Sequence, residues 1–171
     1  LVVLNLDHGL HFESVVRALR LGFSSVMFDG STLEYEENIR QTREVVKMCH
    51  AVGVSVEAEL GAVGGDEGGA LYGHADEAYF TDPALAHDFV DRTGIDALAV
   101  AIGNSHGKYK GEPKLDFTRL DVIRQQTGLP LVLHGGSGIS DADFRRAISL
   151  GIHKINFYTG MSQAALDTVE A

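Results

Sequence analysis

The sequence predicts a parallel α/β fold and, within that class, a (β/α)8 barrel of the TIM type. Short runs rich in Leu, Val and Ile alternate with longer segments whose apolar residues recur three and four positions apart. This alternation is typical of buried parallel strands joined by amphipathic helices. Polar residues follow nearly every strand, as expected where the carboxyl ends of barrel strands surround a functional site.

Six strands are expected, and each is a short apolar run that a parallel sheet would bury on both faces. They span residues 1–6, 24–28, 54–59, 97–102, 130–134 and 154–157. A complete barrel of this type has eight strands. The chain is therefore expected to cover strands 3 to 8, with residues 1–171 forming a single, partial TIM-barrel domain.

Five helices are expected between these strands, and the chain is expected to end in a further helical segment. The five span residues 12–21, 33–52, 83–93, 117–127 and 142–150. Each of them is followed by a glycine, the usual residue just past a helix end. Asp82-Pro83 and Ser140, with Asp143 three residues later, are typical helix starts.

The segment 61–80 interrupts this regular alternation. It is long and rich in glycine and acidic residues, and it lies between a strand and the next helix. A connection of that length in a compact domain is usually functional or disordered. Because it directly follows Glu59, on the face expected to carry the site, we interpret it as a mobile, glycine-rich catalytic loop.

An open, doubly wound sheet fits the same alternation, so the polar strand ends decide between the two folds. An open sheet gathers its ligands at one switch point, whereas a barrel collects them from a ring of strands. Here such residues follow the strands all along the chain: Asp7, His8, Asp29, Glu59, His106, His134 and Asn156. The barrel is therefore the preferred interpretation.

The overall composition excludes several classes of function. The formal net charge is −10, which argues against binding to a nucleic-acid backbone. The single cysteine, Cys49, allows no internal disulfide. No apolar stretch approaches the ~20 residues of a membrane span. We expect a cytoplasmic protein that binds neither nucleic acid nor membrane, while a phosphorylated substrate stays compatible with its charge.

Three histidines, His8, His106 and His134, each close a short apolar run. In a parallel barrel these positions lie at the carboxyl ends of the strands, around one site. Three imidazoles there suit a divalent metal ion with one open coordination position. The alternative, three separate core histidines held by hydrogen bonds, explains their equivalent positions less well.

Five motifs in this order resemble the class II, metal-dependent aldolases of the fructose- and tagatose-bisphosphate type. They read D-H at 7–8, E-A-E-L-G at 57–61, G-G-D-E at 64–67, G-N-S-H-G at 103–107 and H-G-G-S-G at 134–138. Each motif is weak alone, but the ordered set is specific and extends to about Asn156. The resemblance implies reversible cleavage of a phosphorylated ketose into dihydroxyacetone phosphate and an aldehyde, as in carbohydrate metabolism and glycolysis.

Such a cleavage needs a group that stabilises the carbanion formed next to a carbonyl. A Schiff base would require a lysine at a strand end. However, Lys108, Lys110 and Lys114 fall in one loop, and Lys154 is expected to begin a strand. A Lewis-acid metal is therefore the favoured route. The resemblance implies Zn²⁺, and in some members of that family the glycine turns also bind a monovalent cation.

The resemblance assigns the metal ligands individually. His8, His106 and His134 match the three zinc ligands of that family. Asp29 and Glu59 match carboxylates that hold a second or displaced metal position. In the resting state we expect these two carboxylates to hydrogen-bond the ligands, a common way to orient metal-bound histidines.

The resemblance also assigns the proton-transfer residues. Asp7 matches the acid/base that handles the proton of the C4 hydroxyl, and its alternative role is to orient a neighbouring histidine. Glu67 matches the residue that moves the proton at C3 of the triose, from a loop that closes over the substrate. The adjacent Asp66 is the alternative to Glu67 in that role.

Substrate contacts are expected from the glycine turns and from the end of the last strand. By resemblance these are Gly107, Lys110, Gly135, Ser137, Asn156 and Thr159. Glycines let backbone N–H groups approach a phosphate, and a helix start nearby adds its positive end. Tyr158 is bulkier than the residue of the family's pattern, and Asn5 replaces its usual histidine. The particular sugar therefore stays open.

Two alternatives to an aldolase remain open. A metal-dependent hydrolase on the same barrel would use similar zinc ligands. A non-catalytic barrel that binds sugar phosphates would keep the fold without turnover. The phosphate-type glycine turns favour the aldolase over the hydrolase, and Asp7 and Glu67 argue against a non-catalytic protein. The resemblance further implies a homo-dimer or homo-tetramer.

Overall fold

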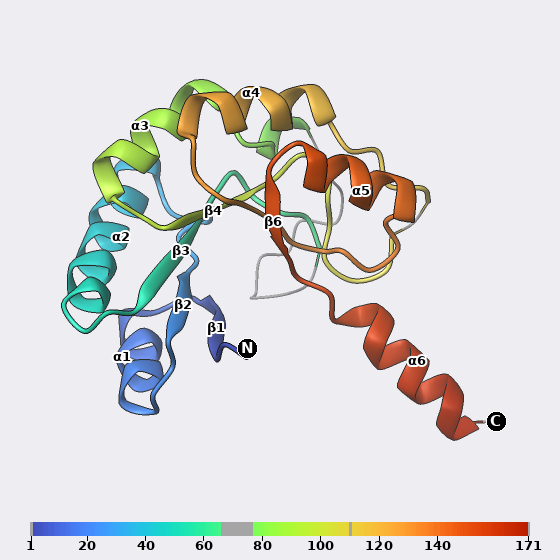
Figure 1. Ribbon diagram of the computed structural model, residues 1–171, viewed down its shortest axis with the longest axis horizontal. Coiled ribbons are helices and arrows are strands. Elements are labelled where there is room, and N and C mark those ends of the chain that lie inside the picture. Colours follow the sequence, from blue (N-terminus) through green and yellow to red (C-terminus); the bar gives the residue numbers. More distant parts are fainter. Residues whose placement is uncertain (1, 66–76, 110, 171) are drawn as a thin grey trace.

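The structure, a computed structural model, describes residues 2–65, 77–109 and 111–170 (Figure 1). Its strands form one parallel sheet in which each strand lies beside the next along the chain. They are β1 (Asn5–Gly9), β2 (Ser25–Phe28), β3 (Ser55–Leu60), β4 (Ala97–Val100), β5 (Leu131–Leu133) and β6 (Ile152–Ile155). The order of these described strands never reverses, which distinguishes the sheet from a doubly wound one. The predicted parallel α/β fold is confirmed, as a six-stranded half-barrel.

Five helices follow one another in an arc outside the strands (Figure 1). They are α1 (Phe12–Arg20), α2 (Tyr35–His50), α3 (Pro83–Thr93), α4 (Phe117–Thr127) and α5 (Asp141–Ser149). A short 3₁₀ turn, η1 (Glu77–Tyr79), precedes α3, and the last helix, α6 (Thr159–Glu170), projects away from the arc. Within the described ranges, no helix combines the length and the apolar character needed to cross a membrane.

The helix ends follow signals that are present in the sequence. Asp82, just before Pro83, caps α3 by accepting a backbone N–H from the first turn, and Ser140 does the same for α5. Gly94 and Gly128 end α3 and α4 with φ angles of 71° and 65°. Glycine is favoured there because other residues rarely adopt this left-handed conformation. These predicted boundaries are confirmed.

Alternation along β3 shows how the sheet separates the core from the concave side. Val56, Ala58 and Leu60 pack in the apolar core that joins the sheet to the helices. Glu57 and Glu59 point to the opposite, concave side and are 3% and 2% exposed. Because side chains alternate across a strand, one short segment both builds the core and places two carboxylates inside the half-barrel.

Strand boundaries differ from the prediction by a few residues, and in β1 and β6 the difference affects residues of the site. β1 spans Asn5–Gly9 rather than 1–6, because an irregularity after Leu6 lets its pairing with β2 continue to Gly9. β6 spans Ile152–Ile155 rather than 154–157, because its register with β5 already begins at Ile152. The expectation that Lys154 begins a strand is therefore wrong. This lysine lies one residue before the carboxyl end of β6.

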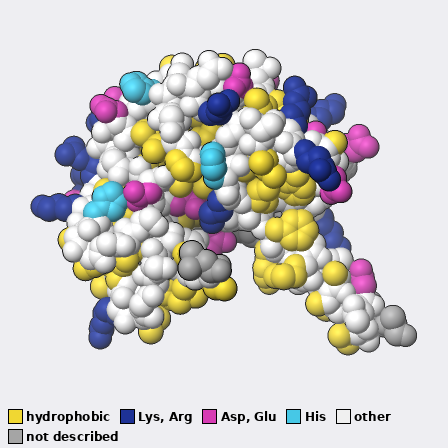
Figure 2. Space-filling view, viewed as in Figure 1, with side chains coloured by type: hydrophobic (Ala, Val, Ile, Leu, Met, Phe, Trp, Pro, Cys, Tyr) yellow, Lys and Arg dark blue, Asp and Glu magenta, His cyan; other side chains and the backbone are white. Residues whose placement is uncertain are grey.

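Both outer strands of the described sheet have a single neighbour, since β1 pairs with β2 and β6 pairs with β5. Apolar side chains close to these edges are exposed, including Val2 (97%), Val3 (57%) and Tyr158 (63%). Figure 2 shows apolar side chains along α6 and at the margin of the molecule that holds α1. Open strand edges are usually covered or closed in native proteins.

Candidate active site

A bulge at the end of β1 aims two consecutive side chains at one place. Leu6 and Gly9 pair with residues only two positions apart on β2, so β1 carries one extra residue between them. His8 has a φ of 47°, in the left-handed region that histidine occupies more readily than most residues. On a regular strand Asp7 and His8 would point to opposite faces. Here Asp7 contacts Asn156 while His8 contacts His134.

Three imidazoles from different strands meet at this end of the half-barrel. The ring centroid of His8 lies 4.9 Å from that of His106 and 4.7 Å from that of His134. The centroids of His106 and His134 are 5.6 Å apart. One nitrogen from each ring lies within 4.8 Å of the others. His134 is fully buried and His106 is 7% exposed. The structure thus brings together the three histidines that the sequence singled out.

Two turns hold His106 and His134 side by side. The buried Asn104 amide donates to the carbonyl oxygen of His134 at 3.1 Å and accepts a backbone N–H within its own turn. Gly135 has a φ of 63°, and a Cβ there would lie 2.1 Å from the carbonyl oxygen of Ser105. The sequence did not single out Asn104. Its signal is a polar amide in a turn between buried residues, where every donor and acceptor needs a partner.

Asp29 and Glu59 contact the site next to His8. The Asp29 carboxylate accepts from Nδ1 of His8 at 2.8 Å and from the Ser31 hydroxyl at 2.6 Å. One oxygen of Glu59 accepts the N–H of Val63 at 3.2 Å. The other is buried without a hydrogen-bond partner among the described residues. His8, Asp29 and Glu59 form a second group whose potential ligand atoms lie within 4.8 Å of one another.

Burial and neighbouring charges shift the proton affinities of these groups. Burial disfavours a charge on His8, but its hydrogen bond to Asp29 and the negative charges nearby outweigh this and raise the pKa of His8 to about 9. Burial, reinforced by Asp29, raises the pKa of Glu59 to about 8. Burial and the positive charge of His8 lower the pKa of His106 to about 3. At neutral pH His8 is therefore charged, whereas His106 is neutral.

The imidazole cluster fits a divalent metal ion. Nε2 of His106 is buried and has no hydrogen-bond partner in the described part of the chain. Nε2 of His8 and Nδ1 of His134 lie 2.9 Å apart, a distance that one shared proton spans. Because Nδ1 of the charged His8 donates to Asp29, its Nε2 donates to His134. A cation bound by three imidazoles would use these same nitrogen lone pairs.

Two polar residues that the sequence did not assign to the site, Glu57 and Lys154, lie next to His134: Glu57 contacts the histidine, and Lys154 contacts Glu57. Oε1 of Glu57 lies 2.9 Å from Nε2 of His134, and its Oε2 lies 2.8 Å from Nζ of Lys154. Burial opposes ionisation of Glu57, but these two partners outweigh it and lower its pKa. The strand period is the signal for Glu57, because it shares the face of Glu59. Lys154 can be recognised as a residue near the carboxyl end of a strand only with the observed bounds of β6.

A pocket of about 420 Å³ opens beside Asp7. Five of the predicted substrate contacts line it: Gly107, Gly135, Ser137, Asn156 and Thr159. Within the pocket, the Asn156 amide donates to Asp7 at 2.8 Å. The Ser137 hydroxyl accepts the N–H of Gly160, at the start of α6, also at 2.8 Å. Tyr158 lines the pocket as well, so the residue that departs from the family's pattern lies where it can affect the choice of substrate.

Three predicted site residues, Asp66, Glu67 and Lys110, lie outside the described residues. The described ends of the segment 61–80 are held close to the imidazoles. The backbone N–H of Ala62 donates to Tyr79 at 2.8 Å, which joins the two ends. The N–H of His106 donates to the carbonyl oxygen of Gly64 at 2.6 Å. The segment therefore leaves and re-enters the described fold beside this site.

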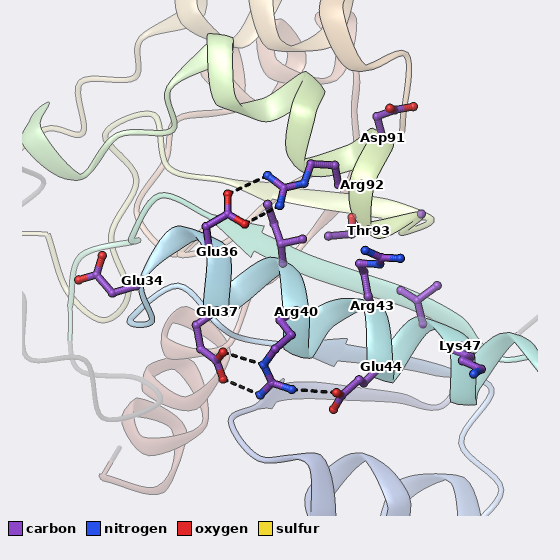
Figure 3. Close-up of a pocket in the computed structure, with 13 residues that line it drawn as sticks. Glu34, Glu36, Glu37, Arg40, Arg43, Glu44, Lys47, Asp91, Arg92 and Thr93 are labelled. Carbon is purple, nitrogen blue, oxygen red and sulfur yellow. Dashed lines mark hydrogen bonds and ion pairs between the residues drawn. The ribbon is translucent and has the colours of Figure 1, made fainter.

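A second hollow, of about 1040 Å³, lies between α2 and α3 (Figure 3). Ion pairs occupy it. Arg92 pairs with Glu36 across the two helices, and Arg40 bridges Glu37 and Glu44 along α2. This hollow is larger than the pocket beside Asp7, but none of the strand-end residues of the site lines it. We therefore take the imidazole cluster, rather than this hollow, as the candidate site.

Fold and site together define a class of protein. It is a parallel α/β half-barrel whose strand ends gather imidazoles and carboxylates able to hold a metal ion. A comparison with known families identifies the chain within this class. The family described as "Fructose-bisphosphate aldolase class-II" matches residues 1–171. The chain belongs to this family of metal-dependent aldolases.

Individual relatives agree with this assignment. The chain is 51% identical over 158 residues to a probable fructose-bisphosphate aldolase of Bacillus subtilis (strain 168), and 52% identical over 158 residues to a fructose-bisphosphate aldolase of Geobacillus stearothermophilus. Each match covers 92% of this chain and 54% of the relative. The crystal structure of the YdjI aldolase from Escherichia coli K12 is similar, with a TM-score of 0.86 and 47% identity. That match covers 99% of this chain and 58% of the other. The chain spans about half the length of the curated relatives it matches.

Proposed function

We propose that the protein is a zinc-dependent aldolase that reversibly cleaves a phosphorylated ketose into dihydroxyacetone phosphate and an aldehyde. The observation that carries this proposal is the meeting of His8, His106 and His134 next to Asp7, which itself lines a pocket with glycine turns. Three imidazoles leave a coordination position open, which a catalytic rather than a purely structural zinc site requires.

The three imidazoles would hold the metal, and Asp29 orients one of them through Nδ1 of His8. When bound, Zn²⁺ supplies a Lewis acid that stabilises the negative charge left on the carbonyl side of the broken carbon–carbon bond. Asp29 and Glu59, which share the second group of ligand atoms with His8, are proposed as the alternative metal position.

Asp7 is proposed as the acid/base for the C4 hydroxyl of the sugar. Its carboxylate is exposed at the pocket, and the amide of Asn156 holds one of its oxygens at 2.8 Å. The other oxygen is left to accept a proton from a substrate hydroxyl during cleavage and to return it during condensation. For C3 we propose Glu67, with Asp66 as its alternative, acting from the glycine-rich segment.

The phosphate is proposed to bind in the same pocket. Gly135, Ser137 and Thr159 line it, and α6 begins at Thr159. Backbone N–H groups and the positive end of a helix attract a phosphate strongly, and hydroxyl groups add further donors. Gly107 and Asn156 complete this set, and Lys110 would add a cation.

We further propose that the described half-barrel is strands 3 to 8 of one eight-stranded barrel domain. Its two outer strands each have an open edge, and exposed apolar residues flank them. Relatives are almost twice as long as the match. Two more strand–helix units between β6 and β1 would close the sheet and cover both edges.

The test is an assay of carbon–carbon cleavage over a panel of ketose 1-phosphates and ketose 1,6-bisphosphates. The expected result is release of dihydroxyacetone phosphate that stops on chelation and returns with Zn²⁺. Hydrolysis of esters or amides, with no triose phosphate released, would replace the aldolase with a metal-dependent hydrolase. Sugar-phosphate binding without any turnover would leave only a binding protein.

A further inference from the structure

We propose that Lys154 is a positioning residue that acts on both halves of the site, holding Glu57 against the metal ligand His134 and orienting the Asn156 amide against Asp7. This inference rests on the proposed function, because it concerns how the metal ligand and the acid/base are held. Neither Lys154 nor Glu57 lines the pocket described above. Their effect would pass through His134 and Asn156.

The first half of the argument is the contact from Lys154 to the metal ligand. Nζ of Lys154 lies 2.8 Å from one oxygen of Glu57, and the other oxygen lies 2.9 Å from Nε2 of His134. The side chains of Glu57 and His134 are 4% and 0% exposed. A buried carboxylate needs a counter-charge and filled hydrogen bonds to be tolerated there. The Lys154 ammonium supplies both.

This contact selects one tautomer of His134. A carboxylate can only accept hydrogen bonds, so Nε2 of His134 must carry the proton that it donates to Glu57. The lone pair is then on Nδ1, which faces Nε2 of His8 at 2.9 Å. That is the nitrogen the imidazole cluster needs for a shared metal ion. Glu57 therefore presents the ligand atom of His134 by holding the opposite edge of its ring.

The second half is the contact from Lys154 to Asn156. Nζ of Lys154 lies 2.8 Å from Oδ1 of Asn156, and an ammonium can only donate. The amide oxygen must therefore face the lysine, which turns the NH₂ group toward Asp7 at 2.8 Å. Nδ2 also lies 3.2 Å from Nε2 of His134, but that nitrogen carries a proton in the selected tautomer. One N–H of the amide is thus directed to Asp7, and Nδ2 also lies 3.5 Å from Nδ1 of His134, the nitrogen that keeps its lone pair.

One ammonium group therefore sets two hydrogen-bond directions that the chemistry needs. Glu57 comes from β3 and Lys154 from β6, whereas His134 follows β5 and Asn156 follows β6. Without the positive charge, Glu57 loses its counter-charge and Asn156 loses the donor that fixes its amide. Glu57 is then no longer anchored against Nε2 of His134, so the ring can take its other tautomer, and the amide of Asn156 is held by Asp7 alone.

The test compares Lys154→Met, which removes the charge but keeps the length, with Lys154→Arg, which keeps the charge. Lys47→Met is the matched control, since Lys47 is exposed on α2. The first readout is the tautomer of His134, taken from the ¹⁵N shifts of its imidazole in the protein without metal. The second is the affinity for Zn²⁺, measured by competition with a chelating dye.

We expect Lys154→Met to convert His134 from a single Nε2–H tautomer to a mixture and to weaken Zn²⁺ binding by roughly 10–100-fold. Lys154→Arg should keep the tautomer and recover much of the affinity, and Lys47→Met should match the parent protein. An unchanged tautomer together with unchanged affinity in Lys154→Met overturns the inference. If that variant does not fold, Glu57→Gln tests the same link and is expected to give the same two changes.

Failure of this inference can be told apart from failure of the proposed function. A parent protein that neither binds Zn²⁺ nor releases triose phosphate refutes the function, whatever Lys154 does. A parent protein that does both, with a Lys154→Met variant that retains its tautomer and affinity, refutes only the positioning role. A merely structural lysine would lower the melting temperature without moving the ¹⁵N shifts of His134.

Discussion

Nε2 of His8 lies 2.9 Å from Nδ1 of His134, although 126 residues separate them in the chain. The bulge in β1 makes this possible by turning His8 toward the concave side, and Glu57 makes it useful by leaving Nδ1 of His134 unprotonated. A proton now fills the space between two nitrogens that a metal ion would bind. Metal binding and proton binding therefore compete at this pair.

This competition predicts that Zn²⁺ binding releases protons. The pKa of His8 is about 9, so at pH 7.5 its imidazole carries a proton that must leave before the metal can bind. We expect about one proton released per Zn²⁺ bound at pH 7.5, and an affinity that rises with pH until about pH 9. Titration calorimetry in buffers of different ionisation enthalpy measures the number directly.

The control for this titration is Asp29→Asn, which removes the negative partner that keeps His8 protonated. Fewer protons should be released at the same pH, because His8 then titrates closer to its ordinary range. A heat of binding that does not depend on the buffer, in the parent protein, would contradict the prediction.

The metal-free protein should lose stability as the pH rises from about 6.5 to 9. His8 has a raised pKa in the folded state, so its contribution is complete below pH 6.5 and is lost as the pH passes through 9. Glu59, with a pKa of about 8, acts in the same direction because its neutral form is the one the fold prefers. Each extra proton bound by the folded state changes the unfolding free energy by about 1.4 kcal/mol per pH unit.

Urea unfolding in the presence of a chelator, repeated across this pH range, shows whether the free energy of unfolding falls or rises with pH. His106 has the opposite effect on stability. Its pKa in the folded state is about 3, so the folded state resists its protonation and loses stability only as the pH falls below 6.5. His8→Gln should flatten the alkaline slope, and it should also reduce the loss of stability on the acid side, because the charge of His8 is one cause of the lowered pKa of His106. A stability that rises between pH 6.5 and 9 would show that the assigned charges are wrong.

Much of this arrangement could be predicted from the sequence, because strand ends follow from simple rules. Short apolar runs place His106 and His134 at the carboxyl ends of parallel strands, and parallel strands in one sheet bring those ends together. The bulge at Asp7 and His8 could not be predicted, since alternation alone puts consecutive residues on opposite faces. Its signal appears only in the pairing with β2.

Glu57 and Lys154 show a second limit of the sequence. Both are charged residues inside strands that are otherwise mostly apolar. Seen alone, each suggests a misplaced strand boundary rather than one member of a functional pair. The buried carboxylate of Glu57 is tolerated because Lys154 supplies its counter-charge, and the two residues are 97 positions apart in the chain. Pattern and period describe one element at a time, so an ion pair between the buried Glu57 of β3 and the half-exposed Lys154 of β6 emerges only from the assembled sheet.

Asp7→Ala should separate proton transfer from metal binding. The Asp7 side chain contacts Asn156 and lines the pocket, and it belongs to neither group of potential metal ligands. We expect kcat to fall by roughly 10²–10⁴, the usual size of a general acid/base contribution, with the zinc content unchanged. Metal analysis beside a cleavage assay gives both quantities. An active variant would remove Asp7 from the acid/base role, and loss of zinc would make it a residue that supports the metal.

Gly135→Ala should disturb the site through the backbone. Its φ is 63°, and a Cβ would lie 2.1 Å from the carbonyl oxygen of Ser105 and 3.0 Å from the amide nitrogen of His106. Gly107→Ala is a matched control, because Gly107 also has a positive φ, 81°, but has no atom within 4 Å of its Cβ position. The control carries only the cost of the left-handed conformation, about 1–2 kcal/mol. Gly135→Ala must in addition move the turn that holds His106, so we expect a further loss of at least about 1 kcal/mol in the free energy of unfolding.

The affinity for Zn²⁺ should fall in Gly135→Ala and stay unchanged in Gly107→Ala, as chelator competition would measure. Equal stability of the two variants would mean that the turns beside His106 and His134 yield to a methyl group, and that the distance between these imidazoles is not set by the backbone.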